Sequence, residues 1–139
     1  MGTLHRRSLL AACAALALAG CGGGDDPDPR NNAERFEGDE RQVAEVVDRL
    51  GEAAREGDTR TICEDLVTAE MQTRVRDASG TSCAQEFEEN IVGAETTFEV
   101  ESIEVGPDEA TAVVVDQQDR RSRLFMVRDQ GEWRITRIG

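Results

Sequence analysis

The spacing of the apolar residues changes near Thr96, and this change restricts the fold more than any other feature of the chain. Before it, apolar residues recur at the three- and four-residue intervals of amphipathic helices. After it, four segments are rich in Val, Ile, Thr and aromatic residues, as β-strands are. The turn-forming sequences GPD, DQQD and DQG separate them. The expected strands are 96–105, 109–115, 121–128 and 133–138.

The first helical segment has a start signal, an apolar stripe and a stop signal. Asp39 can cap its beginning, with Gln42 three residues later to reach back to the cap. Gly57 can adopt the left-handed conformation that ends a helix. The residues of its apolar stripe are Val43, Val46, Val47, Leu50 and Ala54.

Two more helices are expected before the strands begin. Asp58 can cap the second, which continues in broken form over residues 70–77. Ser82 and Gln85 form a capping pair for the third, and Gly93 ends it. The sequence therefore predicts an α+β domain in which three N-terminal helices pack on one face of a four-stranded antiparallel sheet.

The N-terminus has the features of a secretory leader. Residues 9–20 are all Leu, Ala, Cys or Gly and follow the basic pair Arg6 and Arg7. This run is shorter than the roughly 20 residues that a membrane-spanning helix needs. The sequence LAGC, ending at Cys21, resembles the lipobox of bacterial lipoproteins, in which the cysteine is lipidated and becomes the first residue.

We therefore expect a lipoprotein signal peptide over residues 1–20 and a lipid anchor on Cys21, which places the protein on the extracytoplasmic face of the cell membrane. An ordinary signal peptide is the alternative. The arginine pair leaves both twin-arginine and general secretory export open.

The segment that follows Cys21 is acidic and almost without apolar residues, so residues 21–40 are expected to form a flexible tether to a folded domain over residues 41–139. The whole chain has a net charge of −13. Nucleic-acid binding depends on cationic neutralisation of phosphates, so this charge argues against a nucleic-acid partner. Attachment to the membrane is expected through the lipid alone.

Two cysteines remain in the domain once Cys13 has left with the leader and Cys21 has taken the lipid. Cys63 and Cys83 lie on the apolar sides of their expected helices, and disulfides persist outside the cytoplasm. A metal site would need further ligands, and the one histidine lies in the leader. A redox pair usually has C-x-x-C spacing. A structural disulfide is the favoured interpretation, and neither a metal nor a cofactor is expected.

The domain is similar to the NTF2-like, or SnoaL-like, lipoproteins of actinobacteria over roughly residues 41–139. Three stretches carry the resemblance: VAEVVDRLGEAAREGDTRTICEDL at 43–66, TSC at 81–83 and GEWRI at 131–135. The resemblance implies a cone, in which the helices wrap a curved sheet and leave a pocket between them.

The pocket admits three functions. A non-catalytic binding or structural domain is favoured; the alternatives are a small isomerase or dehydratase that uses a cavity carboxylate, and an accessory subunit that dimerises through its sheet. The chain has no tyrosine, and although Asp116 and Arg123 lie near strand ends, no catalytic residue is assigned. The candidate pocket residues are Phe98, Phe125 and Trp133, for which ordinary core packing is the alternative. The ligand or protein partner is not indicated.

Overall fold

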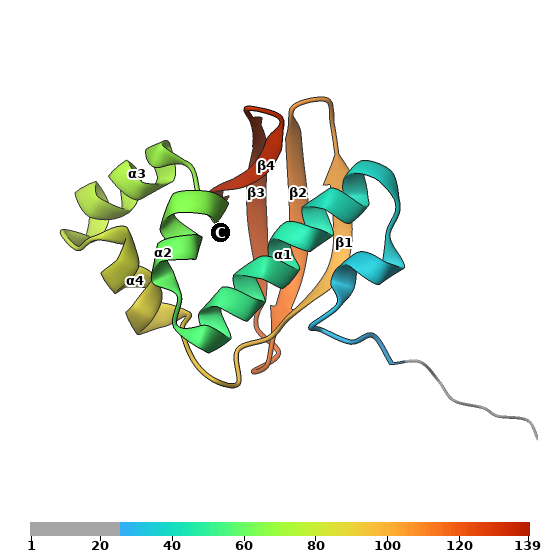
Figure 1. The fold of residues 1–139 in the computed structure, drawn as a ribbon, viewed down its shortest axis with the longest axis horizontal. Helices are drawn as coiled ribbons and strands as arrows, with labels where there is room; N and C mark the ends of the chain where they lie inside the picture. The colour runs from blue at the N-terminus through green and yellow to red at the C-terminus, as the bar shows by residue number, and fades with distance from the viewer. Residues whose placement is uncertain (1–25) are drawn as a thin grey trace, which may run out of the picture.

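The structure is a computed structural model that describes residues 26–139. It confirms an α+β fold with a four-stranded antiparallel sheet (Figure 1). The elements in chain order are the 3₁₀ helix η1 (Asn32–Arg35), α1 (Gly38–Glu56), α2 (Thr59–Thr61), the π-helical turn η2 (Ile62–Leu66), α3 (Ala69–Ser79), α4 (Cys83–Asn90), β1 (Phe98–Val105), β2 (Glu109–Asp116), β3 (Arg121–Asp129) and β4 (Glu132–Ile138).

The sheet is a simple meander in the order β1-β2-β3-β4. Its strands begin and end within two residues of the bounds expected from the sequence, because the turn sequences between them are local signals. Asp119, Gln130 and Gly131 adopt positive φ angles in the last two turns. The strand predictions are confirmed.

Helix α1 crosses the sheet diagonally, and its apolar stripe supplies much of the core (Figure 1). Gly57 ends it in the left-handed conformation, with φ of 72°, as expected. The expected cap at Asp39 is wrong, because the helix begins at Gly38 and Glu37 occupies the cap position without a side-chain hydrogen bond. Asp39 instead pairs with Arg128 of β3 at 3.2 Å.

The expected second helix is divided into α2, η2 and α3, so the structure has four α-helices where three were expected. The division has a tertiary cause. Val67 forms a parallel bridge with Ile135 of β4, and the N–H of Thr68 donates to the Ile135 carbonyl at 2.9 Å. These contacts hold the chain extended at this point, and the Thr68 hydroxyl then caps α3 by accepting from the N–H of Met71.

Part of the segment expected to be a flexible tether is ordered in the structure, because residues 32–35 form η1 and residues 38–40 begin α1. Asn32 is fully buried, and its side-chain amide takes the place of a neighbouring strand beside β1. Its Nδ2 donates to the Phe98 carbonyl at 2.7 Å, and its Oδ1 accepts from the N–H of Val100 at 2.8 Å. Asp48 of α1 accepts from both the backbone and side-chain nitrogens of Asn32. These hydrogen bonds, to residues far away in the sequence, order a segment whose composition alone predicts flexibility.

The predicted pairing of Cys63 with Cys83 is confirmed. The two sulfur atoms are at bonding distance, and the Cα atoms lie 6.1 Å apart. The bond joins η2 to the first residue of α4, so it fastens the helices at one end of the sheet to one another.

Candidate functional site

A cavity of about 360 Å³ lies between α3, α4 and the end of β4, and we call it the α3–α4 cavity. Its walls are mainly apolar. Met71, Val75 and Ala78 line it from α3, all on one side of that helix. Phe87 and Ile91 line it from α4 and the residue that follows, and Ile138 from β4.

The α3–α4 cavity adjoins a second hollow, the sheet-end cavity, of about 440 Å³. The two cavities share three lining residues, Asn90, Ile91 and Ile138. They therefore form adjacent parts of one recess between the helices and the inner face of the sheet, which is the face that α1 covers. The apolar residues that line only the sheet-end cavity are Leu50, Phe98, Val114 and Leu124.

Asn90 and Arg74, two of the polar residues that line the α3–α4 cavity, are exposed, and hydrogen bonds hold both side chains in place. Asn90 donates from Nδ2 to the carbonyl and carboxylate oxygens of Glu86, one turn earlier on α4. Arg74 on α3 donates to the Thr136 carbonyl at 3.1 Å and to Glu70 at 2.7 Å. These bonds hold the arginine against β4, so it fixes one edge of the α3–α4 cavity.

Asp116 is the carboxylate at the sheet-end cavity, and its surroundings favour the ionised form. Burial by itself would raise its pKa, but hydrogen bonds from the backbone N–H groups of Arg120 and Gln118 and from the Arg120 side chain outweigh that effect, so the pKa lies below its usual value. A carboxyl group that acts as a base or acid near neutral pH needs the opposite shift.

The three aromatic residues expected to share a pocket lie in three different places. Phe98 lines the sheet-end cavity on the inner face of the sheet. Phe125 lies on the opposite face, where the Arg137 guanidinium stacks 3.8 Å from its ring centre. Trp133 lies at the other end of β4, against α1. The shared-pocket expectation is wrong, because the strand register places Phe98 and Phe125 on opposite faces.

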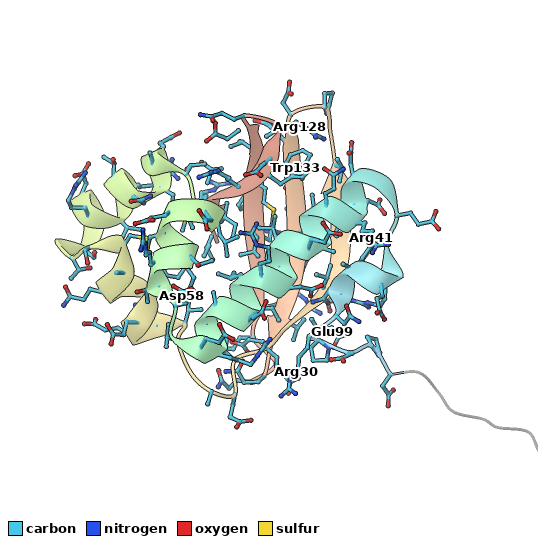
Figure 2. The ribbon with its side chains drawn as sticks, in the orientation of Figure 1. Arg30, Arg41, Asp58, Glu99, Arg128 and Trp133 are labelled. Carbon is cyan, nitrogen blue, oxygen red and sulfur yellow. A yellow bond between two sulfur atoms is a disulfide. The ribbon has the colours of Figure 1, made fainter. Side chains whose placement is uncertain are left out.

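Trp133 belongs to a packed cluster rather than to the recess. It is only 4% exposed, and Arg128 lies 4.4 Å from its ring centre (Figure 2). The same arginine pairs with Asp39, so the guanidinium joins β3 to the first turn of α1. Such a cation–π contact stabilises the fold by about 1 kcal/mol. The remaining candidate aromatic therefore has a structural role.

Cys21 and the leader lie outside the described residues. In residues 26–139, no helix is long and apolar enough to cross a membrane, and no cluster of three or more His, Cys, Asp or Glu side chains could hold a metal ion. The cavity residues of α3 and α4 were missed in the sequence analysis. Their spacing at Met71, Val75 and Ala78 was a usable signal, because it marks one side of a helix.

A scan against models of protein families, a search of curated proteins and a search of solved structures each find no match to this chain.

Proposed function

We propose that this protein is a lipid-anchored binding protein on the extracytoplasmic face of the cell membrane, with a non-catalytic NTF2-like domain. The observation that carries the proposal is the apolar α3–α4 cavity. Its volume of about 360 Å³ falls in the range of roughly 300–1,000 Å³ typical of small-molecule sites. Such sites combine mostly apolar walls with a few fixed polar groups, as this one does.

The wall chemistry suits a ligand with an apolar body. Burial of such a body removes apolar surface of both partners from water, which contributes about 25 cal/mol per Å². Asn90 and the anchored Arg74 stand at the rim, where a polar group of the ligand would remain near solvent. The adjoining sheet-end cavity gives a longer ligand room to extend over Phe98 and Leu124.

A binding role is favoured over the isomerase or dehydratase alternative by the state of Asp116. This carboxylate accepts three hydrogen bonds and has a lowered pKa, so it is a weak base and is not held neutral at pH 7. Catalysis by a cavity carboxylate would need a group poised near neutral pH.

The membrane location in this proposal is inferred from the leader and from Cys21, and the Cys63–Cys83 bond suits an oxidising compartment. Because Asn32 is held on the domain, only the chain between Cys21 and Asn32 separates the lipid from the folded part. Fully extended, that stretch reaches roughly 40 Å. The domain would therefore work close to the bilayer surface.

Filling the cavity tests the proposal. Ala78 is exposed and lines the α3–α4 cavity, so Ala78→Trp would occupy the space without disturbing the core. Ala94→Trp is the matched control, because Ala94 is an exposed turn residue between α4 and β1. Binding of the apolar dye 1-anilinonaphthalene-8-sulfonate is measured by fluorescence titration for each protein. Ala78→Trp should weaken binding by at least tenfold, and Ala94→Trp should leave it unchanged.

Equal dye binding by both variants and the unaltered protein would contradict a ligand site between α3 and α4. Native mass spectrometry of the protein purified from membranes supplies the second readout. An apolar small molecule should accompany the unaltered protein and the Ala94→Trp variant, and it should be lost from Ala78→Trp.

A further inference from the structure

Two arginines lie beside the α3–α4 cavity, at the edge of the sheet. Arg74 of α3 and Arg137 of β4 both line this cavity. Both also line a second hollow of about 560 Å³, which we call the strand hollow because its other walls come from β2, β3 and β4. Residues that line two hollows lie between them, and β4 is the last strand of the sheet. The two arginines therefore lie where the α3–α4 cavity opens past the edge of the sheet.

Arg74 is held at this opening by two hydrogen bonds. Its Nη1 donates to the Thr136 carbonyl at 3.1 Å, and its Nη2 donates to a carboxylate oxygen of Glu70 at 2.7 Å. Because Thr136 directly precedes Arg137, the first bond brings the two arginines to neighbouring positions on β4. A guanidinium has more N–H donors than these two acceptors use, and the side chain is half exposed. N–H groups of Arg74 therefore remain available to a ligand.

Arg137 is exposed, and in residues 26–139 its side chain takes part in no ion pair. Its guanidinium stacks 3.8 Å from the centre of the Phe125 ring. Stacking occupies the flat side of a guanidinium and leaves the N–H groups at its edge free to donate. The aromatic contact thus holds a cation at the opening of the cavity without neutralising it.

The acidic residues nearby leave this positive charge in place. Glu70 balances the charge of Arg74, to which it is paired. Glu86 lines the cavity on the α4 side, where its two carboxylate oxygens accept from Asn90 and Thr81 at 3.0 and 3.2 Å. The strand hollow has its acidic residue on β2, two strands away from β4. The charge of Arg137 is therefore not balanced at the opening.

We propose that the recess binds a single-chain amphiphile with a carboxylate head, the chemical class of free fatty acids. The inference rests on the proposed function of the α3–α4 cavity and adds the chemistry of its ligand. The carboxylate lies between Arg74 and Arg137, because the guanidinium fork matches the two oxygens of a carboxylate. The hydrocarbon chain lies in the α3–α4 cavity, along Met71 and Val75, and points toward the sheet-end cavity.

The shape of the recess suits one long chain. The α3–α4 cavity continues into the sheet-end cavity past Ile91 and Ile138, and apolar walls resume there at Phe98 and Leu124. A hydrocarbon chain in this space would leave water along its whole length, which favours binding in proportion to the apolar area buried. The head would remain at two exposed side chains, so its charge would not be removed from water without a partner.

The net charge of the protein separates local from long-range effects on binding. A charge of −13 attracts cations and repels anions at a distance. A preference for an anionic head must therefore come from direct contact with the arginines. An uncharged or a cationic head on the same chain gains nothing from them.

Three probes with the same alkyl chain isolate the contribution of the head: decanoate, decanol and decyltrimethylammonium. Isothermal titration calorimetry of the purified full-length protein at pH 7, after removal of co-purified lipid, gives the dissociation constant of each probe. Decanoate should bind on the order of tenfold more tightly than decanol, because a hydrogen bond to a charged group is stronger than one to a neutral group. Decyltrimethylammonium should bind more weakly than both.

Arg137→Gln should weaken decanoate binding on the order of tenfold and leave decanol binding unchanged, because only the anionic head uses the guanidinium. Arg76→Gln is the matched control, since Arg76 is exposed on the same helix as Arg74 and lines neither the recess nor the strand hollow. It should change neither affinity. Ala78→Trp, which fills the α3–α4 cavity, should greatly weaken binding of both probes.

Four results would overturn the inference. Equal binding of decanoate and decanol would remove the head preference and leave the binding function intact, whereas binding of none of the probes would contradict the proposed function itself. Decanoate affinity unchanged in Arg137→Gln would show that the arginines do not hold the head. Decanoate binding that survives Ala78→Trp would show that the chain lies outside the cavity. Thermal unfolding of each variant separates lost binding from a lost fold.

Discussion

The structure predicts a large loss of stability when the hydrogen bonds of the Asn32 side-chain amide are removed. Asn32→Ala removes the donor to the Phe98 carbonyl and the acceptor for the N–H of Val100, a residue with no exposed surface. Alanine leaves both backbone groups without a partner. A buried polar group that loses its partner costs about 1–3 kcal/mol, so the loss of two partners should lower the free energy of unfolding by about 2–6 kcal/mol. For a domain of this size that is a large part of the total.

Urea unfolding followed by tryptophan fluorescence measures this loss, because the chain has one tryptophan and Trp133 is buried. Asn31→Ala is the matched control. The neighbouring side chain is half-buried and caps no helix end, so its removal should cost under about 0.5 kcal/mol. Faster hydrogen exchange at the Val100 amide should accompany Asn32→Ala. Equal stabilities of the two variants would refute the claim that the Asn32 side chain pairs with β1 in place of a neighbouring strand.

Three further perturbations follow from individual contacts. Replacing Cys63 and Cys83 together by serine should lower the free energy of unfolding by roughly 3 kcal/mol, because the closed loop no longer restricts the unfolded chain. The midpoint of urea unfolding measures this loss of stability. An unchanged midpoint would contradict the disulfide bond. Asp116 has a lowered pKa, so its contribution to stability is complete above the unfolded pKa of about 3.9 and is lost as the pH falls through the lower folded value. In Asp116→Asn, the free energy of unfolding should therefore depend less on pH in this acid range. An unchanged pH dependence of the free energy of unfolding would contradict the lowered pKa. Gly57→Ala forces a side chain into φ of 72° and should cost about 1 kcal/mol in thermal unfolding, whereas a gain in stability would mean that the helix ends differently.

Sequence reasoning succeeded where the determining signal is local. Gly57 is recognisable as a helix stop, and Ser82 as a cap that accepts from the N–H of Gln85, because the partners lie within a few residues. The strands and turns after Thr96 were predictable for the same reason. The Cys63–Cys83 pair could be inferred because few pairings were open.

The failures share a long-range cause. Asn32 binds Phe98 and Val100, more than sixty residues away, and no local pattern announces such a contact. The second helix is interrupted because Val67 bridges Ile135 of a strand that follows much later. Strand register likewise decides that Phe98 and Phe125 face opposite ways, and no spacing in the sequence fixes that register.

We proposed above that the mature protein is anchored to the membrane by a lipid on Cys21, and the intact mass of the native protein purified from cell membranes is the decisive test of that proposal. We predict a chain that starts at residue 21, carries acyl chains on that residue and retains the Cys63–Cys83 bond. An unmodified chain that still begins at Met1 and is recovered from the cytosol would contradict the account.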